Sequence, residues 1–294
     1  MARKDPNDLS GFEIMKESKD GNVPTPALEK FSIAFNKLQE GRVTFSTKFN
    51  RNIHGDRDGN MSVGPLLILL DTVSGVPVFS KLDKNHICVT RSLDITFPKP
   101  IKKLIGHIEA KGSILQMSED GREAVGKAIL KSEEGESFAV AEAQMAIRKK
   151  VNFSFPHFDL SEMNIAPLGS KEYGSFIDHL GIVFSSDRAT SMKPVQSIHS
   201  NRMGFLHGGV TASFLACSAQ YELQKNKPKD EFIIRHLNIE YKKPIKPEDG
   251  IIYALTDIEP QKGSKHCVRV RVCHQKGKTM LAEGFAVFEH LSLI

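Results

Sequence analysis

The sequence lacks the features of a secreted or membrane-spanning protein. Met1–Asn22 is polar and charged and holds no apolar stretch of the kind found in a secretory signal. No apolar run approaches the ~20 residues that a membrane-spanning helix requires. Cysteine is scarce, and a disulfide framework is not indicated by Cys88, Cys217, Cys267 and Cys273. We therefore expect a cytoplasmic protein with no membrane partner, whose thiols are reduced and buried.

Signatures of cofactor chemistry and of nucleic-acid binding are also missing. The sequence has no glycine-rich phosphate loop, no Ser-His-Asp order and no dinucleotide fingerprint. A formal net charge of +5 is too small to argue for nucleic acid, although it would help a site that receives a polyanion. His266, Cys267, Cys273 and His274 are metal-ligand types, but the two cysteines would lie ~20 Å apart on one strand. We expect no metal, no cofactor and no nucleic-acid partner.

The chain repeats its own pattern. Its 294 residues are enough for two ordinary domains, each with its own core. Leu93–Ile101 (LDITFPKPI) and Leu237–Ile245 (LNIEYKKPI) are alternating strands that both end in Lys-Pro-Ile. An apolar helical segment precedes each of them, Gly64–Ser74 in the first half and Gly208–Ala219 in the second. Further strands follow each one, so the order of strand, long helix and several strands occurs twice.

The two apolar segments predict buried central helices. Leu66–Leu70 is apolar on every side and Gly208–Gln220 carries no charge, and a helix without a polar face is buried. The strand around Val268–Val272 alternates valine with arginine, which indicates a sheet with one buried face. We therefore predict an α+β fold in which, in each half, an antiparallel sheet wraps around a long central helix.

The same patterns suggest domain boundaries. Residues 1–26 are expected to form a polar N-terminal arm. Residues 27–150 are expected to form a first domain, which begins with a helix over Ala27–Leu38. Residues 151–171 show no sustained period and are expected to be a linker, and residues 172–294 are expected to form the second domain.

One motif in the second half is specific. Asn201–Gly209 reads NRMGFLHGG and lies directly before the second apolar helix. It resembles the signature of the phenylacetate-pathway (PaaI-type) hotdog thioesterases, which is Asn-x-x-Gly-x-x-His-Gly-Gly followed by a helix with an acidic residue. Val89-Thr90, followed by LDITFPKP, is similar to the strand that comes after the helix in that family. The resemblance spans most of the chain and implies two tandem hotdog domains.

In that family, two hotdogs pair and each active site is shared between them. The loop of one hotdog supplies Asn and His-Gly-Gly, and its neighbour supplies the helix acid and a strand hydroxyl. The resemblance assigns the loop side to Asn201, His207 and Gly208 of the second half. It assigns the acid to Asp71 and the hydroxyl to Thr90 of the first half. These five residues are the expected catalytic set.

The complementary site is eroded. Its acid position falls on Ala216, which has no carboxylate. Where the family has Asn, Gly, His, Gly and Gly, the loop of the first half has Asp56, Gly59, Ser62, Val63 and Gly64. A fused pair needs only one working site, so the resemblance implies a single composite active site between the halves.

The expected set fits thioester hydrolysis, which places negative charge on the carbonyl oxygen. The N–H of Gly208, at a helix N-terminus, is a natural donor to that oxygen. Partial burial would activate Asp71, either as a base for water or as a nucleophile that forms an anhydride. Asn201 and Thr90 would position the water, and family habit gives His207 the role of orienting the loop.

Each feature also has a purely structural interpretation. Asp71 alone could be a hydrogen-bonding group of an interface, a lone His-Gly-Gly is usually a turn, and Thr90 could simply pack in a strand. The combination favours an enzyme that hydrolyses an acyl-CoA to a carboxylic acid and coenzyme A. A non-catalytic acyl-CoA sensor or scaffold is an alternative, and so is a hotdog hydratase that would use His54 with Asp71. The fused unit is expected to form a homodimer or a higher homo-oligomer.

Overall fold

The computed structural model describes residues 5–151, 155, 175–185, 189–194, 196–260, 263–274 and 279–291. Its helices are α1 Gly11–Lys19, α2 Pro26–Lys30, α3 Arg51–His54, α4 Val63–Phe79, α5 Phe176–His179, α6 Gln196–His199 and α7 Gly208–Asn226, with 3-10 turns at Pro6–Asp8, Ile101–Lys103 and Pro247–Asp249. Its strands are β1 Ala34–Gln39, β2 Arg42–Lys48, β3 His86–Thr96, β4 His107–Met117, β5 Glu123–Ser132, β6 Ser137–Lys149, β7 Ile182–Val183, β8 Ala189–Met192, β9 Phe232–Tyr241, β10 Ile252–Ile258, β11 Lys265–His274 and β12 Met280–His290.

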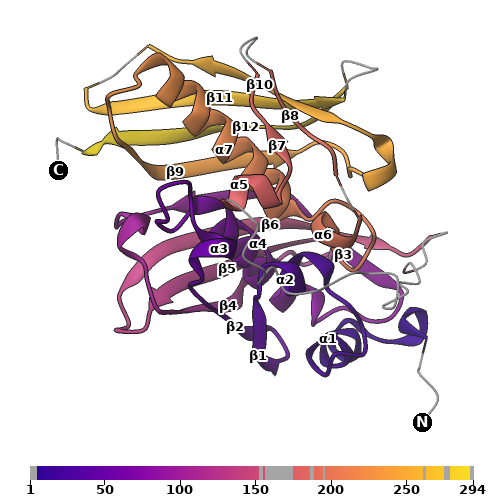
Figure 1. Cartoon of the computed structure of the whole chain (residues 1–294). Coiled ribbons are helices and arrows are strands. Elements are labelled where there is room, and N and C mark those ends of the chain that lie inside the picture. The colour runs from indigo at the N-terminus through magenta and orange to yellow at the C-terminus, as the bar shows by residue number, and fades with distance from the viewer. Residues whose placement is uncertain are drawn as a thin grey trace.

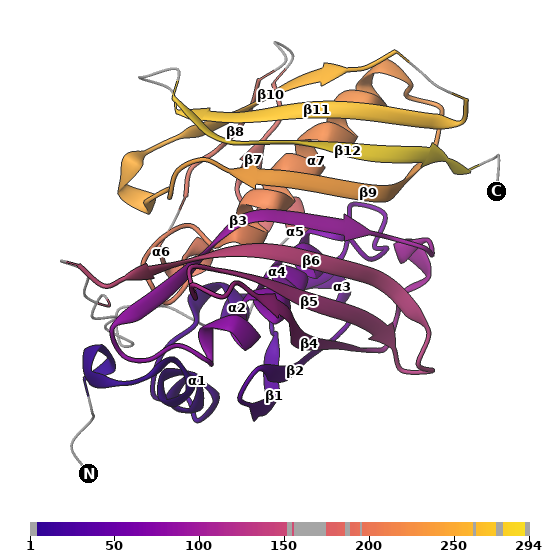
Figure 2. The ribbon, with the colours of Figure 1, turned by 180° about the vertical axis from the view of Figure 1, so that it is seen from behind.

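The described strands form one antiparallel sheet in the order β1-β2-β4-β5-β6-β3-β9-β12-β11-β10-β8-β7. The strands of the first half lie on one side of the β3–β9 pair and those of the second half on the other (Figure 2). In that central pair Leu93 lies opposite Ile239 and Ile95 opposite Leu237. The two repeated strands of the sequence are therefore neighbours, and they join the halves into one sheet.

The long helices α4 and α7 pack against each other on one face of this sheet (Figure 1). Every residue of α4 except Gly75 is buried, as its all-apolar pattern predicted. The helices approach so closely that a Cβ on Gly209 would lie 2.4 Å from the Cα of Ile68. The hydroxyl of Ser213 in α7 donates to the carbonyl of Gly64 in α4 at 2.9 Å. Among the described helices, none is long and apolar enough to cross a membrane.

The alternation in β11 is confirmed, because Val268, Val270 and Val272 are buried on the inner face of the sheet. The expected helix over Ala27–Leu38 is wrong. Only α2 is helical, and Ser32 then adopts a φ of 52°, which ends the helix before β1 begins. The spacing of Phe31, Ile33 and Phe35 is two residues, which suits an extended chain and not a helix face.

The N-terminal residues, expected to be a polar arm, contain helix α1. Ser10 and Glu13 form a capping box at its start, which satisfies backbone N–H groups that a helix leaves unpaired. Ile14 and Met15 are buried, and the N–H of Gly11 donates to the carbonyl of Leu82 just beyond α4. α1 therefore covers the C-terminal end of α4. The expected linker, residues 151–171, lies almost wholly outside the described residues.

Candidate active site

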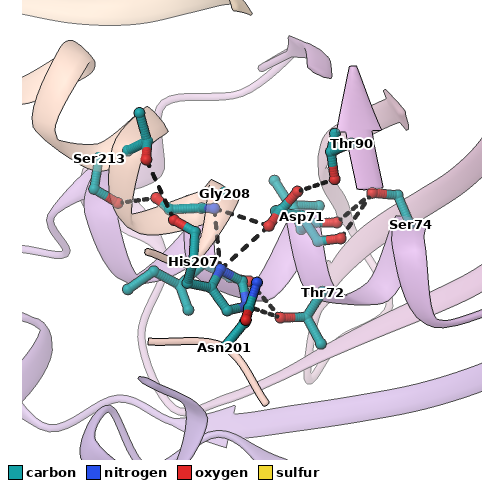
Figure 3. A network of polar contacts seen from close by, with 12 residues as sticks. Asp71, Thr72, Ser74, Thr90, Asn201, His207, Gly208 and Ser213 are labelled. Atoms are coloured by element: carbon teal, nitrogen blue, oxygen red, sulfur yellow. Dashed lines mark hydrogen bonds and ion pairs between the residues drawn. The ribbon is translucent and has the colours of Figure 1, made fainter. Parts of the chain in front are cut away.

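A carboxylate of the first half meets the N-terminus of α7 in the second half. Asp71, in the middle of α4, has an exposed fraction of 6%. Its Oδ2 accepts a hydrogen bond from the N–H of Gly209 at 2.8 Å, and its Oδ1 accepts one from the hydroxyl of Thr90 at 3.2 Å (Figure 3). Two donors from different elements fix the carboxylate where α4, α7 and β3 meet.

His207 is the N-cap residue of α7, and both of its ring nitrogens are engaged. Nδ1 accepts from the N–H of Gly209 at 3.0 Å, so it carries no proton. Nε2 therefore bears the proton and donates to the hydroxyl oxygen of Thr72 at 3.0 Å, while that hydroxyl donates to the carbonyl of Ile68 at 2.9 Å. This network fixes the neutral tautomer and orients the ring.

The charge state of His207 follows from its burial. Burial lowers the pKa of the imidazole; nearby Asp71 opposes this shift and Arg202 adds to it. Nδ1 lies 3.2 Å from Oδ2 of Asp71. With His207 neutral this contact is not an ion pair, because both atoms are acceptors that share the N–H of Gly209. The contact between Asp71 and His207 is therefore bridged by a backbone N–H and is not charge pairing.

Gly208 lies against the carboxylate. A Cβ at this position would be 2.7 Å from Oδ2 of Asp71, so any side chain would displace the acid. Its carbonyl accepts from the hydroxyl of Tyr241 at 2.9 Å. Burial raises the pKa of Tyr241 well above its usual value, which keeps it a donor. The N–H of Gly208 makes no hydrogen bond within the described part of the chain and stands at the positive end of α7.

The loop before α7 is shaped by Asn201. Its Oδ1 accepts from the backbone N–H of Met203 at 2.8 Å and of Phe205 at 3.3 Å, which closes a tight turn. Gly204 in this turn has a φ of 78°, a conformation that glycine adopts without strain. Asn201 thus holds the loop before α7, through its side-chain oxygen.

These residues border a cavity of about 680 Å³ at the junction of the halves. Its wall comes from α2, α4, β3, the end of β6, the loop before α7 and the segment after β9. The residues that line it include Asp71, Thr72, Phe79, Cys88, Thr90, Arg148, Lys149, Asn201, Arg202, His207, Gly208, Tyr241 and Lys243. The expected set of Asp71, Thr90, Asn201, His207 and Gly208 thus borders a single cavity.

The first half contains the same loop geometry. Asp56 replaces Asn201 and its Oδ1 accepts from two loop N–H groups, those of Asp58 and Asn60, at 3.0 and 2.9 Å. Gly59 has a φ of 84°, matching Gly204. The two loops therefore share one turn, although the loop of the first half lacks His-Gly-Gly.

In the first half, the position that corresponds to the cavity beside Asp71 is occupied by Phe176. A Cβ on Gly64 would lie 1.8 Å from the ring of Phe176, which is fully buried. The N–H of Phe176 donates to the carbonyl of Gly55, as the N–H of Ala27 donates to that of Ser200. Alanine thus stands at the open site where phenylalanine stands at the closed one. The cavity left there, which Ala216 does not border, measures about 260 Å³.

The expected catalytic set leaves out three neighbours of Asp71. Gly209, which belongs to the motif, donates to Asp71. Tyr241 donates to the carbonyl of Gly208, and Thr72 contacts His207. Tyr241 occupies the repeat position that Phe97 holds in the first half, so a polar-for-apolar exchange between the repeats could have revealed it. Thr72 has no such signal, because one hydroxyl in a buried helix is usually bonded to its own backbone.

Two other sequence features lie elsewhere. Cys267 and Cys273 both lie on strand β11, so the strand geometry that gives their ~20 Å separation applies.

His54 is fully buried. Its Nε2 contacts the carbonyl of Phe31 at 2.8 Å, and its Nδ1 accepts from the N–H of Asn50 at 3.1 Å. It does not border the cavity of Asp71. The pair required for a hydratase is therefore not assembled from His54.

Known structures share this architecture. A TesB protein from Mycobacterium avium subspecies paratuberculosis superposes with a TM-score of 0.60 at 9% identity, over 90% of this chain and 97% of that one. A putative oleoyl thioesterase from Lactobacillus plantarum gives 0.56 at 9% identity, over 86% and 98% of the two chains. The 12:0-ACP thioesterase from Umbellularia californica gives 0.55 at 10% identity, over 85% and 94%. The fold is that of the hotdog thioesterases.

A sequence-based family match covers part of the second half of the chain. Residues 203–281 match the model of the thioesterase superfamily. The matched segment includes His207, Gly208 and the whole of α7, but it starts after Asn201 and leaves out the first half. No curated protein matches the sequence. The hotdog resemblance drawn from the motif is thus confirmed, at a sequence identity that shows the fold and not the substrate.

Proposed function

We propose that this protein hydrolyses an acyl-CoA to a carboxylic acid and coenzyme A at one composite site. The observation that carries the proposal is the 2.8 Å hydrogen bond between Asp71 of one half and Gly209 of the other. It brings a buried carboxylate to a helix N-terminus that has a spare N–H, beside a cavity large enough for an acyl group. The thioesterase match of residues 203–281 supports the same reaction class.

The spare N–H belongs to Gly208. A thioester carbonyl oxygen seated there would accept this hydrogen bond at the positive end of α7. As the tetrahedral intermediate forms, the oxygen becomes negative and the interaction strengthens. One such donor commonly supplies ~3 kcal/mol of transition-state stabilisation. The hydroxyl of Tyr241, bonded to the carbonyl of Gly208, holds this peptide in position.

Asp71 supplies the other half of the chemistry. As a base it would take a proton from water, whose oxygen attacks the thioester carbon; the C–S bond then breaks and the sulfur leaves as thiolate, which is protonated. As a nucleophile, its oxygen would form the C–O bond of an anhydride while the C–S bond breaks and the sulfur leaves as thiolate. Water then cleaves the anhydride to the carboxylic acid and the carboxylate of Asp71, and the proton released is taken up by the thiolate. Thr90 and Gly209 restrain the carboxylate in either route. His207 orients the loop, because neither ring nitrogen is free to accept a proton from water.

The proposal includes a tandem architecture. We propose that residues 27–150 and 172–294 are two hotdog domains, and that only one of their two possible sites works. Support comes from the sheet order on the two sides of β3–β9, from the matching turns at Asp56 and Asn201, and from Phe176, which fills the second site. We further propose that the fused units associate as a homo-oligomer.

Release of free thiol from a panel of acyl-CoA thioesters tests the proposal. We expect the wild-type chain to release thiol and Asp71→Ala to be slower by ~10²–10⁴-fold. Release that is unchanged in Asp71→Ala would reject the site. If no thioester releases thiol but acyl-CoA raises the melting temperature, the protein is a sensor or scaffold instead. Hydration of crotonyl-CoA, measured in parallel, would reveal a hydratase.

A further inference from the structure

Arg202 lies in the cavity wall directly after Asn201. The turn closed by Asn201 fixes its backbone, and its guanidinium stacks over the ring of Phe79 at 5.0 Å from the ring centre. One of its terminal nitrogens also contacts the sulfur of Met15 in α1. Phe79 is eight residues beyond Asp71, about 12 Å along the axis of α4. The guanidinium therefore stands toward the C-terminal end of α4, beside α1.

No described residue forms an ion pair that would compensate the charge of Arg202. Its two contacts within this part of the chain are an aromatic ring and a thioether, which is a weak acceptor. Most of its five N–H donors therefore have no acceptor among the residues that the structure describes. Burial lowers its pKa to about 10, so it remains a cation at neutral pH. The thiol of Cys88 beside it is neutral, since burial raises its pKa to about 12.

The rest of the cavity wall gives the ligand a direction. Arg148, Lys149 and Lys243 border the same cavity, and their side chains are exposed. Exposed cations suit the phosphates of coenzyme A, which stay in water. Arg202 is instead set among Phe79, Met15 and Cys88, all buried. An acyl chain that runs from Asp71 along α4 into this apolar part of the cavity would end beside Arg202, while the phosphates stay at the exposed rim.

We propose that Arg202 binds a carboxylate at the far end of the acyl group, so that the site takes monothioesters of dicarboxylic acids. A guanidinium pairs with a carboxylate through two parallel hydrogen bonds, and such charge-assisted bonds are strong where water is excluded. An unsubstituted acyl chain would instead cover the partly buried cation without giving it a partner, which costs free energy. The inference rests on the proposed function, because it assumes that the cavity holds an acyl thioester.

Matched substrates and matched variants test the role of Arg202. Thiol release is measured with succinyl-, glutaryl- and adipyl-CoA against butyryl-, pentanoyl- and hexanoyl-CoA. We expect kcat/KM to favour the dicarboxylic series by about 10- to 100-fold. Arg202→Met should remove that preference while leaving the unsubstituted series within a few-fold, and Arg202→Gln is a second variant that keeps hydrogen-bond donors. Arg57→Met is the control, because Arg57 holds the same turn position beside the closed site.

The outcomes separate this inference from the proposed function. If wild type prefers the unsubstituted series, or if both series fall equally in the Arg202 variants, the inference is wrong and the thioesterase proposal stands. If no thioester is hydrolysed, the proposed function fails and binding decides the inference. A larger rise in melting temperature with glutaryl-CoA than with pentanoyl-CoA, lost in Arg202→Met, would support it. Equal rises would overturn it.

Discussion

Oδ2 of Asp71 lies 2.8 Å from the backbone nitrogen of Gly209, although 138 residues separate them in the chain. The contact exists only because α4 and α7 pack against each other on one sheet. Neither half contains the whole arrangement, since Ala216 replaces the acid in one and Val63-Gly64 replaces Gly208-Gly209 in the other. The proposed chemistry therefore depends on the junction of the halves, and several variants can test it.

Replacing Asp71 by Asn should separate chemistry from structure. The amide keeps the size of the carboxylate, and its oxygen can still accept from Gly209, but it is neither a base nor a nucleophile. We expect kcat for thiol release to fall by ~10²–10⁴-fold with a small change in melting temperature. Asp94→Asn, on an exposed position of β3, is the control and should leave kcat unchanged. A rate in Asp71→Asn near that of wild type would exclude both catalytic roles of the carboxylate.

Gly208 should tolerate no side chain. A Cβ would lie 2.7 Å from Oδ2 of Asp71, so Gly208→Ala must push the carboxylate away or turn the N–H of residue 208. Either movement harms oxyanion binding, and we expect kcat to drop by ~10²-fold or more. Val63→Ala is the matched control at the same repeat position. Comparable activity in the two variants would show that this peptide takes no part in the reaction.

The central helices and the alternation of β11 could be predicted from the sequence, because they depend on the period of apolar residues along the chain. The hotdog fold could be predicted from the motif, because the motif depends on the spacing of a few residues. The N-terminal third was harder to predict. Ser32 ends the helix expected over Ala27–Leu38 because it adopts a left-handed conformation. The two-residue apolar spacing indicates the extended chain there, but it does not indicate which residue ends the helix. Thr72 and Arg202 acquire their surroundings only when α4 meets the loop before α7. Such contacts join residues more than a hundred positions apart, so a linear pattern does not reveal them.

Phe176 should stabilise the closed site without affecting the open one. Its ring is fully buried against Gly64 and lies 5.1 Å from the ring of Phe31. We expect Phe176→Ala to lower the free energy of unfolding by ~3–5 kcal/mol, measured by urea titration, because it leaves a cavity. The rate of thiol release should stay within a few-fold, since Asp71 lies at the other site. Phe285→Ala is the control, because the ring of Phe285 is partly exposed. A smaller decrease in unfolding free energy for this variant would show that the effect of Phe176→Ala comes from burial of the ring. If Phe176→Ala instead abolished turnover in a folded protein, the two sites could not be independent.

Acid should weaken the fold partly through His199. Burial lowers the pKa of this imidazole from 6.5 to about 4, so the folded state prefers it neutral. As the pH falls, the unfolded chain binds the proton before the folded chain does. The stability that the neutral ring contributes is therefore complete above pH 6.5 and is lost as the pH falls toward 4. That loss amounts to about 3 kcal/mol.

We expect His199→Gln to flatten the decline of unfolding free energy between these pH values, while His107→Gln, at an exposed position, should not. Parallel pH profiles for wild type and His199→Gln would mean that the buried ring does not govern acid stability. The pKa of His207 is lowered for the same reason, so part of the decline should remain in His199→Gln.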